Sequence, residues 1–263
     1  MPEIKTLSGA GFTMDCAVFG VGTRPFVILP GMSLHAVTPL AEAVAGAYAD
    51  FAARYRCYLF DRRTDMPDAY SVRDMARDTA RAMEMLSLEE ADVFGASQGG
   101  MIAQCLAATK PHLVRRLALG STLARQNEVS RATFSLWDEL ARAGDPVVLN
   151  RAITGRVYSE ETRRAYRDVF AATERDGTEE EMRRFGILSR ASLAFSFYEE
   201  LDAIRCPVLA IGTEEDRVLS VQGTREIIER LSCEGYVYRG FGHAVYDEAG
   251  ADYQRRLFSF FQA

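Results

Sequence analysis

The sequence has few cysteines and histidines, and neither residue type forms a cluster. No CxxC or Cys/His spacing occurs among the five scattered cysteines, Cys16, Cys57, Cys105, Cys206 and Cys233. This pattern argues against a zinc site and is typical of proteins in reducing compartments. Long blocks of like charge are also missing, although 31 basic and 37 acidic residues give a net charge of -6. We therefore expect no metal and no nucleic-acid partner.

Targeting and membrane signals are missing as well. The amino terminus, MPEIKTLSGAGF, has no apolar segment behind a basic start, so it is not expected to be a signal peptide. The longest uncharged stretch, residues 25–41, contains three prolines and a glycine, which favour a strand and a turn over a membrane span. We expect a cytoplasmic protein with a small-molecule substrate and no membrane partner.

Short apolar segments alternate with helical patterns along most of the chain. Predicted strands, rich in β-branched and aromatic residues, cover residues 14–19, 26–29, 57–60, 92–94, 116–119, 208–211 and 236–238. Predicted helices cover residues 41–55, 72–86, 98–109 and 251–261. This alternation predicts an α/β fold with a mostly parallel central sheet, right-handed crossovers and helices on its faces.

One region interrupts the alternation. Residues 126–201 lose the strand signals and become charged and helix-favouring, which predicts a helical cap inserted late in the sheet. The core would then consist of residues 1–125 and 202–263. The cap contains Phe134 and Trp137, which either pack it against the core or line a substrate pocket.

A serine lies between two glycines in DVFGASQGGMIAQ, at Gly95-Ala96-Ser97-Gln98-Gly99. The segment follows a predicted strand and opens a predicted helix, as a nucleophile elbow requires. The backbone N–H of Gln98, at the start of that helix, could stabilise negative charge on a carbonyl oxygen. The alternative is that Ser97 is only a small residue in a tight turn.

A serine nucleophile needs a base, and the chain offers three histidines. His112 follows an apolar helix and is expected in a solvated loop. His35 follows the first glycine-containing turn and could border a pocket or serve the structure only. His243 follows the last predicted strand, at the sheet edge where open α/β sheets place their sites. We therefore predict His243 as the base.

The acid should lie between the serine and the histidine in sequence. Three consecutive carboxylates, Glu214, Glu215 and Asp216, follow the predicted strand at 208–211. We favour Asp216, with Glu215 as the alternative.

Together these segments resemble the α/β-hydrolase superfamily over essentially the whole chain. The similar segments are FVILPGMS, YLFDRR, DVFGASQGGMIAQ, CPVLAIGTEEDRV and YRGFGHAVYDE. The resemblance implies that Ser97 attacks, that His243 acts as base and then acid, and that Asp216 orients the imidazole. It also implies oxyanion donors in the backbone amides of Met32 and Gln98, a helical cap over the pocket, and no cofactor.

Two features depart from the family pattern. The oxyanion turn usually reads His-Gly, whereas here it reads Pro30-Gly31, so only a backbone donor remains. The Gly-x-Gly-x-Ser that commonly follows Asp-x-Arg is missing after Arg62 and Arg63, which could hold an acidic substrate group or form structural ion pairs. Beyond Gly31, the candidate pocket residues are Ser33, His35, Phe134 and Trp137.

The resemblance leaves the substrate open. We expect a serine hydrolase that cleaves a small ester-like or related carbonyl compound through an acyl-enzyme. An acyltransferase of the same fold and a non-catalytic ligand-binding member are the alternatives. A homodimer is expected only from the general frequency of such assemblies.

Overall fold

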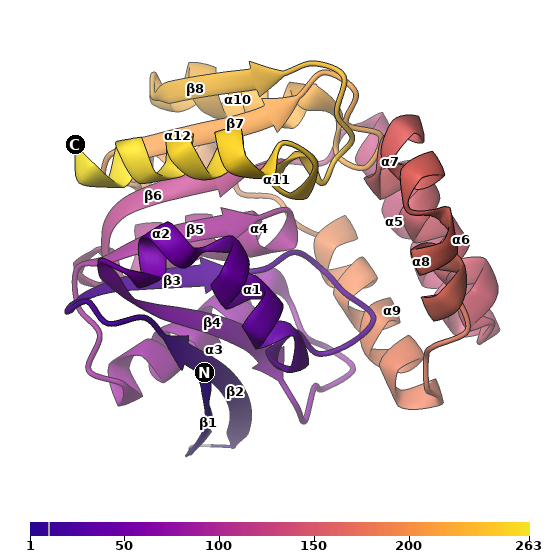
Figure 1. Ribbon diagram of the computed structural model, residues 1–263, viewed down its shortest axis with the longest axis horizontal. Coiled ribbons are helices and arrows are strands. Elements are labelled where there is room, and N and C mark those ends of the chain that lie inside the picture. Colours follow the sequence, from indigo (N-terminus) through magenta and orange to yellow (C-terminus); the bar gives the residue numbers. More distant parts are fainter. Residues whose placement is uncertain (10) are drawn as a thin grey trace.

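An eight-stranded sheet forms the centre of the computed structural model, which describes residues 1–9 and 11–263 (Figure 1). The strand order is β1-β2-β4-β3-β5-β6-β7-β8. β2 pairs antiparallel with β1 and β4, and every other pairing is parallel. The strands are β1 Glu3–Gly9, β2 Phe12–Phe19, β3 Arg24–Leu29, β4 Tyr55–Arg63, β5 Ala91–Ala96, β6 Val114–Gly120, β7 Val208–Thr213 and β8 Glu234–Tyr238.

Helices cover both faces of the sheet. The helices of one face are α1 Ala41–Ala47, α2 Ala49–Ala52, α11 Val245–Glu248 and α12 Gly250–Gln262. Those of the other face are α3 Val72–Met85, α4 Gln98–Thr109 and α10 Ser220–Leu231. Short 3-10 helices occur at Thr38–Leu40, Pro111–Leu113 and Tyr198–Ala203. The result is the three-layer arrangement that a parallel sheet needs to bury both of its faces.

The two faces of the sheet have separate apolar cores. On β3, Phe26 and Ile28 point into the core beneath α1, α2 and α12, while Val27 and Leu29 point into the core beneath α3 and α4. This alternation follows from the two-residue period of a strand. α4 is buried over its first ten residues because it lies between the sheet and α3, which explains its nearly continuous apolar sequence.

Five α-helices, followed by the 3-10 helix Tyr198–Ala203, separate β6 from β7. The five α-helices are α5 Glu128–Ala143, α6 Pro146–Val157, α7 Glu160–Ala165, α8 Arg167–Thr173 and α9 Glu179–Leu193. Figure 1 shows them together beyond the carboxyl ends of the parallel strands. Within the group α5 packs along α9. We call these residues, 126–201, the helical insertion.

The strands predicted from the sequence are all present, and the predicted helix at 98–109 matches α4. The prediction of one helix over 41–55 was wrong, because the chain forms α1 and α2 and already enters β4 at Tyr55. β1 was not predicted, because Leu7 is its only buried residue and its sequence carries no apolar alternation. Within the described part of the chain, no helix has the length and apolar character needed to cross a membrane.

Candidate active site

Ser97 occupies the sharp turn between β5 and α4. Its backbone angles, φ 52° and ψ -119°, lie in a region that L-residues rarely adopt. Two hydrogen bonds hold the turn: the Ser97 amide donates to the Gly120 carbonyl at 2.8 Å, and the Thr122 hydroxyl donates to the Ser97 carbonyl at 2.7 Å. The strained geometry is therefore fixed from the neighbouring β6 side of the sheet.

The glycines around Ser97 are required by close backbone contacts. A Cβ on Gly99 would lie 2.0 Å from the carbonyl oxygen of Leu29, and one on Gly95 would lie 2.5 Å from the carbonyl oxygen of Gly99. No side chain fits at either position without moving the backbone. This explains why the serine lies in a Gly-x-Ser-x-Gly segment.

The structure brings the three residues predicted for catalysis into one hydrogen-bonded chain. The Ser97 Oγ lies 3.0 Å from the His243 Nε2, and the His243 Nδ1 lies 2.9 Å from the Asp216 Oδ2. All three residues are buried. Such an arrangement places an imidazole where it can accept the serine proton while a carboxylate stabilises the resulting imidazolium.

Asp216 is fixed by the loop that follows β7. Its Oδ1 accepts the backbone amides of Val218 and Leu219, both at 2.8 Å, which leaves Oδ2 for the histidine. The neighbouring carboxylates point elsewhere: Glu215 accepts the Gly240 amide, and Glu214 pairs with a surface arginine of α10. Of the three candidates, Asp216 is the one that reaches His243.

The loop that carries His243 is tied to the helical insertion. The Glu248 carboxylate accepts the Ser159 amide at 2.7 Å through one oxygen and the Gly242 amide through the other. The Ala244 amide donates to the Val157 carbonyl at 3.0 Å. Glu248 was not singled out from the sequence, where an acidic residue at a helix terminus carries no distinguishing signal.

The turn after β3 passes over the serine. A Cβ on Gly31 would lie 3.3 Å from the Ser97 Cβ. Met32 follows and is half-buried, with its Sδ 3.8 Å from the Ser189 hydroxyl of α9. Gln98, the first residue of α4, is fully buried. The segments that carry Met32 and Gln98 thus adjoin the serine from two sides.

Other predicted pocket residues take structural partners. The Ser33 hydroxyl donates to the His35 carbonyl at 2.7 Å, and the exposed His35 ring lies 2.9 Å from the Glu181 carboxylate on α9. The hydrogen bond to His35 is the main reason why the pKa of Glu181 falls to about 2. Phe134 and Trp137 are buried, with ring centroids 6.0 Å apart.

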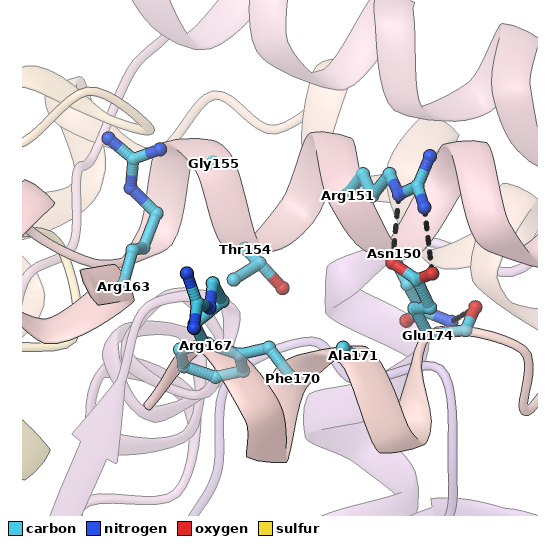
Figure 2. Close-up of a pocket in the computed structure, with 9 residues that line it drawn as sticks. All are labelled: Asn150, Arg151, Thr154, Gly155, Arg163, Arg167, Phe170, Ala171 and Glu174. Atoms are coloured by element: carbon cyan, nitrogen blue, oxygen red, sulfur yellow. Dashed lines mark hydrogen bonds and ion pairs between the residues drawn. The ribbon is translucent and has the colours of Figure 1, made fainter. Parts of the chain in front are cut away.

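No group of three His, Cys, Asp or Glu side chains suited to a metal ion occurs among the described residues. Away from the serine, a surface cavity of about 300 Å³ lies within the helical insertion (Figure 2). At one end of it Arg151 and Glu174 form a two-pronged ion pair, with N···O distances of 2.8 and 2.7 Å. No residue that lines this cavity contributes to the Ser97–His243–Asp216 chain.

The sequence model of the family described as "alpha/beta hydrolase fold" matches residues 24–250. The chain belongs to this family. A protein of Rhizobium rhizogenes named "Putative carbamate hydrolase RutD" is 26% identical over 202 residues, which are 76% of this chain and 77% of the relative. "Pyrrolizixenacetamide deacetylase" of Xenorhabdus hominickii is 25% identical over 199 residues, and the alignment covers 72% of this chain and 72% of the relative.

Solved structures show the same α/β-hydrolase architecture. The enol-lactonase from Burkholderia xenovorans LB400 superposes with a TM-score of 0.85 at 18% identity, covering 98% of this chain and 100% of the other. MGS-M2, an alpha/beta hydrolase enzyme from a deep-sea metagenome library, gives a TM-score of 0.88 at 18% identity and 98% coverage of both. The fold predicted from the sequence is therefore confirmed.

Proposed function

We propose that the protein is a serine hydrolase that cleaves a small ester, carbamate or amide through an acyl-enzyme. The observation that carries this proposal is the hydrogen-bonded chain Ser97–His243–Asp216 at a strained elbow in an α/β hydrolase. The names of the two relatives, a carbamate hydrolase and a deacetylase, are the reason for including substrates whose leaving group is bonded through nitrogen as well as through oxygen.

In the proposed reaction, the Ser97 Oγ attacks the substrate carbonyl carbon while the His243 Nε2 accepts its proton. Asp216 holds the Nδ1–H tautomer of the imidazole, because its carboxylate oxygen can only accept a hydrogen bond from Nδ1, while its other oxygen is fixed by two backbone amides. The amides of Met32 and Gln98 donate to the oxyanion. His243 then protonates the leaving group, and a water molecule deprotonated by the same imidazole releases the acid and regenerates Ser97.

The helical insertion supplies the cover of the site in this proposal. Val157, the last residue of α6, and Ser159 are hydrogen-bonded to the histidine loop, and Ser189 of α9 contacts Met32 in the turn beside the serine, which supports this role. We propose that residues 126–201 form a cap domain that shapes the substrate pocket. The aromatic contacts of Phe134 and Trp137 would then stabilise the cap internally.

A fluorophosphonate probe tests the reaction type, because it phosphonylates only an activated serine. Intact mass and peptide mapping should place the label on Ser97 and show none in Ser97→Ala or His243→Ala. Ser121→Ala is the matched control, since Ser121 is also buried and has a positive φ of 41° but no hydrogen-bond partner for its Oγ in the described part of the chain. Labelling of the Ser97→Ala variant at the parental rate would refute the proposal.

A substrate panel then separates the chemical classes. Matched p-nitrophenyl esters, carbamates and anilides with short acyl chains should be hydrolysed at rates that fall by several orders of magnitude in Ser97→Ala. Addition of an acceptor alcohol or amine distinguishes hydrolysis from acyl transfer. Formation of the transferred product at the expense of the free acid would replace the hydrolase assignment with an acyltransferase.

A further inference from the structure

Arg62, near the carboxyl end of β4, is a buried cation without an acidic partner. Its Nη2 donates to the Pro30 carbonyl at 2.8 Å, and its Nε and Nη2 both donate to the side-chain oxygen of Gln98 at 3.3 Å. Among the described residues, no carboxylate forms an ion pair with it. The adjacent Asp61 carboxylate is occupied by the backbone amides of Val37, Thr38 and Arg62 itself. Burial lowers the pKa of Arg62 to about 10, which still leaves it charged at neutral pH.

The side chain of Gln98 extends this contact to the helical insertion. Its Nε2 donates to the Leu188 carbonyl at 3.0 Å and to the Ser192 hydroxyl at 2.8 Å, both on α9. Among the residues that the structure describes, the oxygen accepts only from the arginine and the nitrogen donates only to α9, so the amide has a single orientation. A continuous set of hydrogen bonds therefore runs from Pro30 through Arg62 and Gln98 to α9.

The two oxygens that Arg62 binds belong to the two segments that adjoin Ser97. Pro30 precedes the turn that carries Met32, and Gln98 follows the serine. A guanidinium is planar, so donors held on two acceptors fix the distance between them. A buried cation whose hydrogen bonds all go to neutral oxygens is costly to keep, even with the Asp61 charge nearby, and offers little net stability. Its geometry thus calls for an explanation beyond packing.

We propose that Arg62 is a positioning residue that sets the spacing of the two oxyanion donors and couples it, through Gln98, to α9. This inference rests on the proposed function, because it assigns Met32 and Gln98 the role of donors. It predicts that loss of the guanidinium slows reactions that pass through a tetrahedral oxyanion. The binding of substrate in its ground state should change little.

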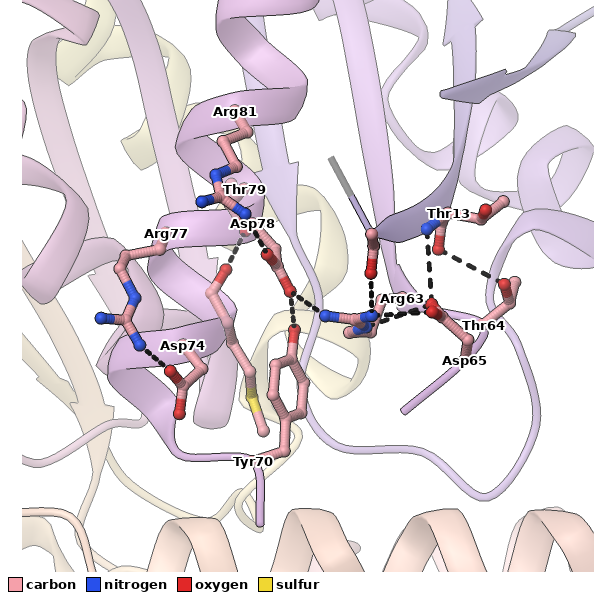
Figure 3. A network of polar contacts seen from close by, with 12 residues as sticks. Thr13, Arg63, Thr64, Asp65, Tyr70, Asp74, Arg77, Asp78, Thr79 and Arg81 are labelled. Atoms are coloured by element: carbon pink, nitrogen blue, oxygen red, sulfur yellow. Dashed lines mark hydrogen bonds and ion pairs between the residues drawn. The ribbon is translucent and has the colours of Figure 1, made fainter. Parts of the chain in front are cut away.

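Arg63 provides a matched control on the same strand. Its guanidinium pairs with Asp65 at 2.7 Å and Asp78 at 3.3 Å and donates to the Gly11 carbonyl, in a network that also includes Tyr70 (Figure 3). These contacts fasten β4 to α3 and to the β1–β2 hairpin and do not reach Ser97. Arg63→Met removes the partly buried guanidinium of the neighbouring residue and leaves the oxyanion turn untouched.

The experiment compares the parent with Arg62→Met, Arg62→Lys and Arg63→Met by the rate constant of fluorophosphonate labelling, read by intact mass. Displacement of one oxyanion donor costs about 10²-fold in rate in comparable enzymes. We expect Arg62→Met to be labelled about 10–100-fold more slowly. Arg62→Lys should not restore the rate, because an ammonium cannot span both acceptors. Arg63→Met should remain within about twofold of the parent.

Two further readouts separate positioning from a merely structural role. In steady-state hydrolysis the loss in Arg62→Met should appear in kcat with KM unchanged. Affinity for a trifluoromethyl ketone, which forms a tetrahedral adduct with the serine, should fall by the same factor as kcat/KM. If Arg62→Met does not fold, Gln98→Leu tests the same link, since it removes the side-chain amide and keeps the backbone N–H. We expect the same 10–100-fold loss.

The outcomes distinguish this inference from the proposed function. If folded Arg62→Met is labelled at the parental rate, the proposed role of Arg62 is wrong. The same holds for Gln98→Leu where it is used in place of Arg62→Met. In either case, labelling of the parent at Ser97 still supports the serine hydrolase. An equal slowing in Arg63→Met also overturns it, because it would show a general effect of losing an arginine from the end of β4. A parent that is not labelled at all refutes the serine hydrolase and this inference together.

Discussion

Ser97 should be under backbone strain that glycine relieves and alanine does not. Its φ of 52° with ψ of -119° is a conformation that costs a residue with a Cβ about 1–3 kcal/mol. Ser97→Ala and Ser97→Gly both lose the hydrogen bond to His243, so their difference in stability isolates the strain. Glycine also lowers the free energy of unfolding by about 0.5–1 kcal/mol, because the unfolded chain has more conformational freedom at a glycine. The net expectation is that Ser97→Gly is more stable than Ser97→Ala by about 1 kcal/mol.

Thermal unfolding converts this difference into a measurable shift. A chain of 263 residues unfolds with an entropy of about 0.5 kcal/mol per kelvin, so the Tm values of the two variants should differ by about 2 °C. Ser259 is the control, because it is exposed within α12, where glycine should be less stable than alanine by about 1 kcal/mol. Calorimetry of the four variants would refute the reasoning if glycine were also the less stable choice at position 97.

Three further results are expected. Asp216→Asn should fold normally yet lower kcat about 10³–10⁴-fold, because an amide can hold the wrong imidazole tautomer; steady-state kinetics giving less than a tenfold loss would contradict this. Glu181 has its pKa held at about 2, so the stability that Glu181→Gln removes should be complete above pH 4.5 and vanish as the pH falls towards 2. Urea titrations at several pH values check this, and a difference that persists at pH 2 would count against it. Burial raises the pKa of all five thiols, so the native protein should react with a thiol reagent at pH 8 far more slowly than the unfolded chain; equal rates would show that the cysteines are not buried.

Local sequence was sufficient where local sterics decide the structure. The β5–α4 junction follows from glycines that no other residue could replace, and α4 follows from a nearly continuous apolar segment. The end of α2 depends instead on pairing in the sheet: Tyr55 starts β4 because it lies opposite Arg24 of β3. That partner lies 31 positions away, so helix propensity extended the predicted helix too far.

In the candidate site, too, the sequence restricted the choice of residues and the fold decided between them. The order of serine, acid and histidine restricted the acid to the segment after β7, but the choice of Asp216 over Glu215 depended on which carboxylate the loop turns towards His243. Arg62 and Arg63 face opposite sides of the sheet because they are neighbours on a strand. The sequence does not show which of the two faces Ser97. Only the fold shows that one of them joins an ion-pair network and the other the turn beside Ser97.

Two of the contacts that hold the helical insertion in place reach residues beside the serine or on the histidine loop. One joins Ser159 to the histidine loop through Glu248, and the other joins α9 to Gln98. An insertion held at both places cannot swing about a single hinge without disturbing the reactive groups. α7 and α8 lie between the ties and have no buried side chains, so their displacement costs least. α7 and α8 can therefore shift more easily than α6 or α9 without breaking the hydrogen bonds that hold Gln98 and the histidine loop.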